Sequence, residues 1–325
     1  MGDRPLLARE MLFFGGKGGV GKTTLASAFA LLAAERGHRT LLVSTDPAHS
    51  TADILETEVG PEPRQIMAKL WAMEIDPARE ADRYISEVKQ RIADTTPPRL
   101  VAEVERQIDI ARVTPGAEEA ALFERFTKIM EDAGSRYDRI LFDTAPLGQT
   151  LRLLSLPELM TAWMGGLISR RKKVNVLGRM WRTVAGAAAG DESAEPDPVL
   201  VALEQRKARF LRARERITDD ARTAFVFVAI PERLPLLETE KAVAALAKYD
   251  VPVGAIVVNR VLPDGAEGAF LARRREREAD LLAQLHETYR RYPVYRVPQF
   301  DTDVHGFSGL RRVIAELPPG ERMHP

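Results

Sequence analysis

The stretch Gly15–Thr24 reads GGKGGVGKTT and decides the fold of this chain. Within it, Gly16, Gly21, Lys22 and Thr23 occupy the fixed positions of the G-x-x-x-x-G-K-[ST] motif. Glycines at such positions let successive backbone N–H groups close around phosphate oxygens. The stretch therefore predicts a phosphate-binding loop. An ordinary glycine-rich turn is the alternative, and the flanking segments argue against it.

The segments on either side of the loop have the pattern that a phosphate site requires. Met11–Phe14 is a short apolar run typical of a strand, and Thr24–Arg36 is an alanine- and leucine-rich helix that ends at Gly37. Bound phosphates would then lie at a helix N-terminus, where backbone N–H groups favour anions. The remaining loop residues, Gly18, Gly19, Val20 and Thr24, are expected to complete the same cradle.

A second lysine, Lys17, directly follows the first glycine of the motif. This makes the loop a deviant Walker A motif, in which a further positive charge is available for the nucleotide beyond that of Lys22. The sequence contains no internal repeat of the loop. We therefore expect one nucleotide site per chain.

Composition limits the classes of protein to which this chain of 325 residues can belong. The 47 basic and 47 acidic residues balance, and a nucleic-acid partner, which selects for a basic domain, is not expected. The absence of cysteine excludes disulfides, thiolate zinc sites and cysteine-ligated iron–sulfur clusters. With no apolar run long enough to span a bilayer, we expect a cytoplasmic protein, either soluble or peripheral at the membrane.

Apolar strand-like runs alternate with helical segments, which is typical of a doubly wound, mostly parallel α/β sheet. The predicted strands are Met11–Phe14, Thr40–Ser44, Trp71–Ile75, Arg139–Phe142, Ala224–Ile230, Gly254–Val258 and Val294–Val297. Two helix-rich stretches, at about 80–133 and 156–216, depart from this rhythm. We interpret them as insertions that build a helical subdomain on a single domain covering residues 1–325.

Two aspartates follow predicted strands, at the carboxyl edge where open α/β sheets bind ligands. Asp46 follows the second strand in STDPAHS, and Asp143 follows three apolar residues in DTAPLGQT. The second pattern is that of a Walker B carboxylate, which supports Mg²⁺. A single aspartate at a strand end is more often a turn or cap residue, but two of them downstream of a phosphate loop favour a metal and water site.

The residue types predict a division of roles in a site for ATP and Mg²⁺. Lys22 would bind the β- and γ-phosphates, the Thr23 hydroxyl would ligate Mg²⁺, and Asp143 would support the metal. Asp46 would orient the attacking water by hydrogen bonding. Gly148 has no side chain to block its N–H from a γ-phosphate oxygen.

With these motifs the chain resembles the arsenite-transport ATPase family, which includes the ATPase of the guided-entry pathway for tail-anchored membrane proteins. The stretches GGKGGVGKTT, STDPAHS, DTAPLGQTLRLL, IPERLPLLETEKAV (230–243) and VVNRVLP (257–263) look like its signatures in the correct order. The resemblance covers nearly the whole chain and is nearest to the prokaryotic, cysteine-free form of the guided-entry ATPase. It implies a P-loop ATPase fold and ATP hydrolysis.

The resemblance also implies roles that the residues alone do not establish. It implies that Lys17 reaches across a symmetric homodimer to the partner's nucleotide. It also implies that Asn259 recognises the adenine and that Glu232 lies near the nucleotide without touching it. The loop Pro298, Gln299 and Phe300 would form a wall beside the base. Structural alternatives stay open: Asn259 fits a strand end, Pro298 fits a turn, and Glu232 fits an ordinary surface position.

Three departures from the family pattern limit what the resemblance carries over. Without cysteine, neither the arsenite site of the metalloid pumps nor the zinc-bound Cys-x-x-Cys of eukaryotic targeting members can form here. The pumps carry two homologous halves, whereas this chain has one. Leu147 and Gln149 replace the usual threonine and histidine of DTAPTGHT, so no role of that histidine applies.

Three functions remain in competition. The first is a homodimeric ATPase that captures and releases a hydrophobic transmembrane segment, with a membrane receptor as a further partner. The second is the ATP-hydrolysing subunit of an anion or metalloid transporter, and the third is a Par- or Min-like positioning ATPase. Met160, Trp163 and Met164, in a basic segment without acidic residues at 159–190, are the candidate client-binding residues. Packing of these side chains against the sheet is the alternative.

Overall fold

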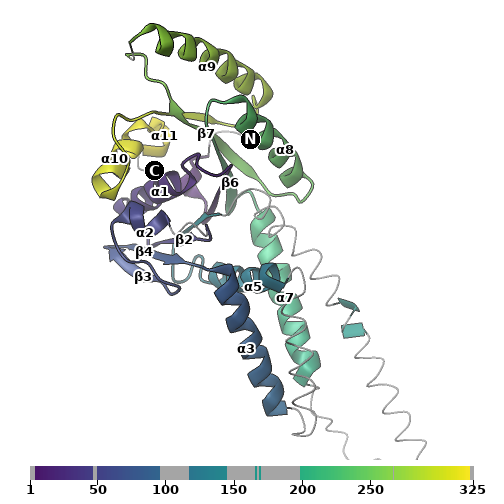
Figure 1. Ribbon diagram of the computed structural model, residues 1–325. Helices are drawn as coiled ribbons and strands as arrows, with labels where there is room; N and C mark the ends of the chain where they lie inside the picture. The colour runs from purple at the N-terminus through teal and green to yellow at the C-terminus, as the bar shows by residue number, and fades with distance from the viewer. Residues whose placement is uncertain are drawn as a thin grey trace, which may run out of the picture.

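The computed structural model describes residues 4–46, 50–95, 117–144, 165–166, 168–169, 198–265 and 267–322. Within them the chain forms one eight-stranded sheet of order β3-β4-β2-β5-β1-β6-β7-β8, with helices on both faces (Figure 1). All neighbouring strands are parallel except the antiparallel pair β3–β4. The predicted doubly wound, mostly parallel α/β sheet is confirmed.

The strands follow the predicted positions closely, with one addition. They are β1 (Met11–Gly15), β2 (Thr40–Ser44), β3 (Arg64–Met67), β4 (Leu70–Glu74), β5 (Arg139–Asp143), β6 (Thr223–Ala229), β7 (Val253–Val261) and β8 (Val294–Pro298). The sequence pattern missed β3, a short edge strand whose side chains are exposed or half-buried. An edge strand of this kind has no continuous apolar run by which to recognise it.

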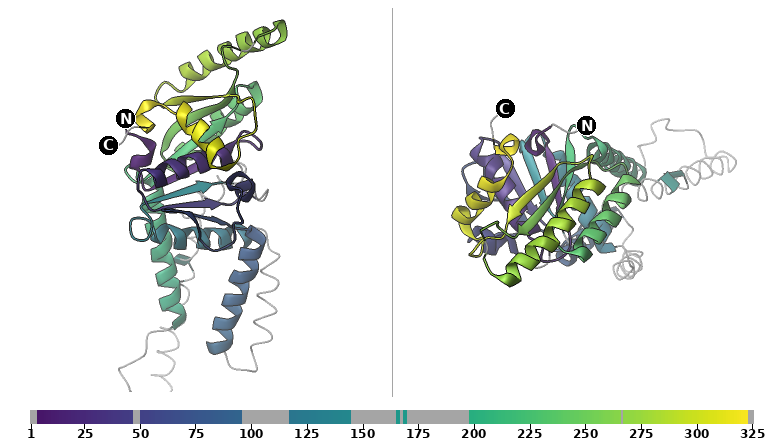
Figure 2. Two further views of the ribbon diagram at one scale, coloured as in Figure 1. Left: turned by 90° about the vertical axis from the view of Figure 1, so that its left-hand side faces the viewer. Right: turned by 90° about the horizontal axis from the view of Figure 1, so that it is seen from above.

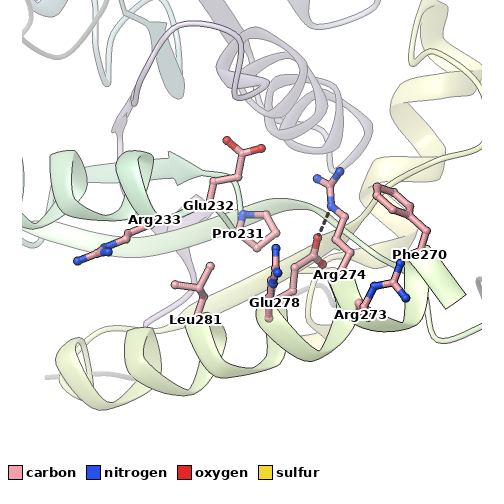
Figure 3. A pocket seen from close by; sticks show the side chains of 9 residues that line it. Pro231, Glu232, Arg233, Phe270, Arg273, Arg274, Glu278 and Leu281 are labelled. Carbon is pink, nitrogen blue, oxygen red and sulfur yellow. Dashed lines mark hydrogen bonds and ion pairs between the residues drawn. The ribbon is translucent and has the colours of Figure 1, made fainter.

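The helices connect these strands and cover the sheet. They are α1 (Lys22–Glu35), α2 (Ser50–Leu55), α3 (Pro77–Thr95), α5 (Ala117–Glu131), α7 (Pro198–Thr218), α8 (Arg233–Ala247), α9 (Ala269–Thr288), α10 (Gly306–Glu316) and α11 (Pro319–Arg322), with a short 3-10 turn at Leu6–Ala8. The turn before α8 faces α9 (Figure 3). No helix in the described ranges has both the length and the apolar character needed to cross a membrane.

The central strand β1 contributes to two hydrophobic clusters, one on each face of the sheet. Met11 and Phe13 belong to one cluster, and Leu12 and Phe14 belong to the other. This alternation is expected because successive side chains of a strand point to opposite faces. On the first face, the rings of Phe13 and Phe142 stack with centroids 4.6 Å apart. Both faces of the central strand are therefore buried, which fixes the position of the loop that follows it.

Helix α1 is buried along almost its whole length on the second face. Its alanines, leucines and Phe29 are packed between the sheet and α10. A helix that is apolar all round is the type found in the core of a large domain. Because α1 cannot shift without disturbing this core, its N-terminus is a rigid end to the phosphate loop.

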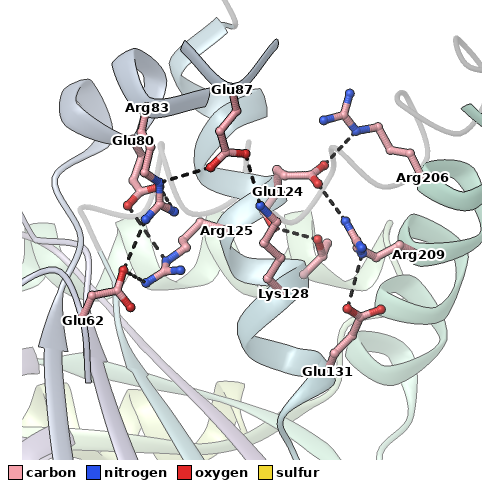
Figure 4. Close-up of polar contacts among 11 residues, drawn as sticks. Glu62, Glu80, Arg83, Glu87, Glu124, Arg125, Lys128, Glu131, Arg206 and Arg209 are labelled. Carbon is pink, nitrogen blue, oxygen red and sulfur yellow. Dashed lines mark hydrogen bonds and ion pairs between the residues drawn. The ribbon is translucent and has the colours of Figure 1, made fainter. Parts of the chain in front are cut away.

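Helices α3 and α7 extend away from the sheet on the same side, and α5 lies at their base (Figures 1 and 2). Ion pairs fasten the three helices together there (Figure 4). On α5, Glu124 accepts hydrogen bonds from Arg206 and Arg209 of α7 at 3.0 and 2.9 Å. A second set of ion pairs joins the segment just before β3 to α3 and α5. Its members are Glu62, Glu80, Arg83, Glu87, Arg125 and Lys128.

Both projecting helices fall in the stretches 80–133 and 156–216 that were interpreted as insertions. The second half of α5 packs on the sheet through Phe126 and Met130. Most residues between α5 and α7, like those between α3 and α5, lie outside the described part of the chain. The helical subdomain and its boundaries therefore remain a prediction.

We expect Glu124→Ala to lower the free energy of unfolding by about 1–3 kcal/mol, because the glutamate is nearly buried and joins two arginines of another helix. Urea unfolding followed by circular dichroism measures the change. Glu131→Ala is the matched control. Glu131 lies on the same helix and also pairs with Arg209 and Arg212, but it is exposed, so its loss should change stability by less than about 1 kcal/mol. Equal effects of the two substitutions would contradict the assigned importance of Glu124.

Candidate functional site

The phosphate loop runs from the end of β1 to the start of α1, and its glycines are required by the local geometry. Gly21 caps α1 with φ of 95°, and Gly19 has φ of 79°, conformations that side chains other than glycine rarely adopt. A Cβ on Gly16 would lie 2.1 Å from the carbonyl oxygen of Val228. The loop is thus pressed against the end of β6, and its backbone is free of side chains where an anion would approach.

Lys22 lies inside this loop. Its side chain is only 3% exposed, and its ammonium is 3.7 Å from Oδ2 of Asp46. The ammonium also donates a hydrogen bond to the carbonyl oxygen of Lys17 at 3.3 Å. A buried ammonium at a helix N-terminus, with one carboxylate near it, is a suitable group to bind phosphate oxygens.

Asp143 ends β5 directly beside the start of α1 and is fully buried. Its Oδ2 accepts hydrogen bonds from the Thr23 hydroxyl at 2.7 Å and from the Ser44 hydroxyl at 3.4 Å. Its Oδ1 is buried and has no hydrogen-bond partner among the described residues. Burial raises the pKa of the Asp143 carboxyl to about 7, against the opposing effects of the Thr23 hydrogen bond and of the Lys22 charge.

This hydroxyl–carboxylate pair fits a magnesium ion. A buried carboxylate oxygen without a partner is costly unless water or a cation satisfies it, and Mg²⁺ prefers oxygen ligands while keeping several waters. The described ranges contain no group of three or more His, Asp or Glu that could hold a metal ion. Thr23 and Asp143, joined by a hydrogen bond of 2.7 Å, are residues that could hold the magnesium ion of a nucleotide.

Asp46 follows β2 and lies beside the phosphate loop. Besides the contact with Lys22, its backbone N–H donates to the Ser44 hydroxyl at 3.3 Å. Ser44 thus touches both Asp46 and Asp143, and sequence reasoning did not identify it. Its place as the last residue of a strand, two residues before the aspartate, is the signal that could have found it.

Asn259 of β7 reaches the phosphate loop from the other side. Its side-chain amide donates to the carbonyl oxygen of Val20 at 2.9 Å, and a Cβ on Gly21 would lie 2.2 Å from the amide nitrogen. The backbone N–H of Gln299 donates to the carbonyl oxygen of Val261 at the end of the same strand. The predicted adenine-site residues Asn259, Pro298, Gln299 and Phe300 therefore follow one another along the edge formed by β7 and β8, and the ring of Phe300 lies under the Arg312 guanidinium.

Glu232 precedes α8 and lines a pocket between that turn and α9 (Figure 3). Arginines surround the pocket: Arg233, Arg273, Arg274 and Arg277. The buried Glu278 at its base accepts hydrogen bonds from Arg274 and from the backbone N–H of Leu262. The structure thus places Glu232 at a basic rim beside the carboxyl edge of the sheet.

Lys17 points away from the cradle that holds Lys22. Its side chain is 38% exposed, and its ammonium is 3.6 Å from Oε1 of Glu238 on α8. The remaining predicted site residues, Gly148, Met160, Trp163 and Met164, lie outside the described residues.

Comparison with known proteins agrees with this geometry. The sequence pattern of the family described as "Anion-transporting ATPase" matches residues 9–318. The chain is similar to putative arsenical pump-driving ATPase 2 of Aquifex aeolicus, with 34% identity over 96% of this chain and 100% of that protein. It is 32% identical to ATPase ASNA1 homolog 1 of Paramecium tetraurelia, over 93% of this chain and 90% of that protein. It is 31% identical to ATPase get3 of Schizosaccharomyces pombe, over 93% and 89% respectively.

The raised pKa of Asp143 predicts a pH dependence of stability in protein without nucleotide or divalent metal. Because the folded carboxyl binds its proton more tightly than the unfolded one, its contribution to the free energy of unfolding is greatest below pH 3.8 and is lost as the pH rises to about 7. Asp143→Asn removes this titration. We expect the free energy of unfolding of the wild type, minus that of Asp143→Asn, to fall by up to about 4 kcal/mol across this range.

Asp138→Asn is the control of opposite sign for this experiment. A hydrogen bond from Arg39 lowers the pKa of the Asp138 carboxyl, so its contribution to stability is lost as the pH falls rather than as it rises. Urea unfolding at several pH values, with both variants, measures the two differences. A wild-type minus Asp143→Asn difference that does not change with pH would contradict the assigned environment of Asp143.

Proposed function

Because this chain belongs to the anion-transporting ATPase family and is an ATP hydrolase, we propose that it works as a homodimer that couples ATP binding and hydrolysis to capture and release of a hydrophobic transmembrane segment. The observation that carries the nucleotide part is the 2.7 Å hydrogen bond from Thr23 to the buried Asp143, next to the contact between Lys22 and Asp46. The phosphate loop, the hydrogen-bonded Thr23 and Asp143 and the second carboxylate of Asp46 thus lie at one edge of the sheet.

The residues at this edge have separate roles in the proposal. Lys22 and the loop backbone bind the β- and γ-phosphates, while Thr23 and Asp143 would hold Mg²⁺. The metal, when bound, neutralises charge that develops on the phosphate oxygens. The buried Oδ1 of Asp143, which has no hydrogen-bond partner among the described residues, supports this assignment because water or a cation would satisfy it.

Asp46 orients the attacking water. Its carboxylate is 3.7 Å from the ammonium of Lys22, so a water hydrogen-bonded to Asp46 would lie beside the phosphates that Lys22 binds. The water oxygen forms the new bond to the γ-phosphorus as the bond to the β-phosphate oxygen breaks, which yields ADP and phosphate. Gly148 would contribute its N–H to the same phosphate.

We further propose that the adenine lies against Asn259 and the Pro298–Phe300 turn, with Glu232 behind it, and that Lys17 acts on the nucleotide of the second copy. The hydrogen bond from Asn259 to Val20 supports the first part, since it brings the end of β7 to the phosphate loop. The partly exposed Lys17 side chain, whose ammonium pairs with Glu238 of α8 and not with a group of its own cradle, supports the second part.

The client part of the proposal rests on the helices beneath the sheet. Helices α3 and α7 project to one side, and α7 exposes Val201 and Leu211. Similarity to the ATPase get3 and ASNA1 proteins supports a targeting role. We propose that the insertions form a groove whose lining includes Met160, Trp163 and Met164.

A second candidate is an ATP-hydrolysing subunit of an anion or metalloid transporter. The arsenical pump-driving name of the Aquifex relative favours it. The absence of cysteine counts against it, because soft metalloids bind thiolates and this chain has none.

The catalytic assignment predicts different effects for two substitutions. Asp46→Asn should keep nucleotide affinity and lower kcat by about 10²- to 10⁴-fold, because it removes only the group that orients water. Lys22→Ala should weaken ATP binding by about 10- to 100-fold, because a charge-assisted contact to phosphate is lost. Phosphate release and binding of a fluorescent ATP analogue measure the two effects. Asp264→Asn, on an exposed loop, is the control; wild-type turnover of Asp46→Asn would rule out the role given to Asp46.

The client assignment predicts that replacing Met160, Trp163 and Met164 together with aspartate abolishes capture of a fluorescent transmembrane peptide while basal ATP hydrolysis is kept. Capture by apolar contact is lost because charged side chains disfavour burial of the peptide's apolar surface. Phe270→Asp is the control, since this exposed residue lies on α9, away from α3 and α7. Antimonite stimulation of the ATPase without any peptide capture would favour the transporter function instead.

A further inference from the structure

The two lysines of the phosphate loop have opposite environments. Lys22 is buried in the cradle and lies near Asp46, whereas Lys17 is partly exposed and pairs with Glu238 of α8. In the described part of the chain, Glu238 has no ion pair other than the one with Lys17. Helix α8 follows β6, the strand that flanks β1, so this contact joins the loop to the next helix along the sheet.

We propose that Glu238 is the positioning residue for Lys17: in the separate chain it holds the ammonium outside its own phosphate cradle, and it releases the ammonium when the triphosphate of a second copy approaches. The inference rests on the proposed action of Lys17 on the second copy's nucleotide. It adds a residue on α8 that controls where the second lysine points.

Electrostatics explains why such a holding residue is needed. The Lys22 ammonium is bonded to the carbonyl oxygen of Lys17, so the two lysines are close through the loop backbone. A second ammonium turning inward would be repelled by Lys22 and would add charge to the chain's own nucleotide. The carboxylate of Glu238 offers Lys17 an alternative partner on the outer side.

The face of α8 that carries Glu238 also fits contact with a second copy. Leu234 and Leu237 are among the few large apolar side chains that the described residues expose. Leu234 is four residues before Glu238 and shares its face of the helix, and Leu237 is three residues after Leu234 and borders that face. A second copy that covers these leucines would bring its triphosphate towards Lys17. The Lys17 ammonium would then leave the Glu238 carboxylate for the triphosphate of the second copy, which carries more negative charge.

The ion pair must break for this exchange, so its removal should favour nucleotide-dependent dimerisation. An exposed ion pair changes an equilibrium constant by up to about fivefold. We expect Glu238→Gln to lower the dimer Kd, in the presence of Mg²⁺ and a non-hydrolysable ATP analogue, by about two- to fivefold. Without nucleotide it should change nothing. Sedimentation velocity over a range of protein concentrations gives the Kd.

Two controls isolate the ion pair from a general change on α8. Glu240→Gln removes the same charge two residues along the helix, at an exposed position, and should leave the Kd unchanged. In a Lys17→Ala background, Glu238→Gln should have no further effect, because the partner is gone. A weaker dimer for Glu238→Gln, or equal effects of Glu238→Gln and Glu240→Gln, would overturn the inference.

A second measurement separates this inference from the dimer proposal. Acetylation of lysines in nucleotide-free protein, at a concentration where it is monomeric, reports access to the Lys17 amine. Glu238→Gln should raise the acetylation rate of Lys17 by about two- to fivefold over the wild type, and Glu240→Gln should not. If the wild type never dimerises with nucleotide, the dimer proposal fails. Equal Lys17 rates in the wild type and Glu238→Gln overturn the positioning role in either case.

Discussion

The carboxylate of Asp143 is buried at the end of β5, where it accepts hydrogen bonds from Thr23 at the start of α1 and from Ser44 at the end of β2. The Asp143 carboxylate thereby links β5, α1 and β2. Because a buried carboxylate is unfavourable without hydrogen-bond partners, loss of either hydroxyl contact would destabilise this site. Ser44 extends the link to the backbone of Asp46, so one hydroxyl connects the Asp143 carboxylate to the loop that carries Asp46.

The parallel sheet makes this arrangement possible. In the register of the strands, Asp143 is paired with Phe14 on one side and with Ser44 on the other. The chain continues this pattern beyond the strands, since the backbone N–H of Thr45 donates to the carbonyl oxygen of Asp143 and that of Thr144 donates to Phe14. The phosphate loop, Asp46 and Asp143 therefore leave the sheet side by side. Their chemistry follows from strand order as much as from residue type.

Local sequence predicted the parts of this molecule that local physics determines. The phosphate loop has a fixed spacing, and the buried parallel strands are continuous apolar runs, so both were predictable from the residues. The edge strand β3 was missed because its exposed side chains carry no such pattern. Ser44 and Glu238 were missed for another reason: their partners Asp143 and Lys17 are distant in sequence, and neither residue type is diagnostic of a site.

The ion pairs between α5 and its neighbours have a mechanical consequence for the long helices. Helix α3 has 19 residues, which corresponds to a rod about 28 Å long. It is held near one end by the ion pairs of Arg83 with Glu62 and of Arg125 with Glu80. Such a rod is a lever with its pivot at the sheet. About 18 Å of the helix extends beyond Arg83, so a rotation of about 10° at this point carries the far tip through about 3 Å. Small adjustments at the base are thus amplified into displacements the size of a side chain at the tip.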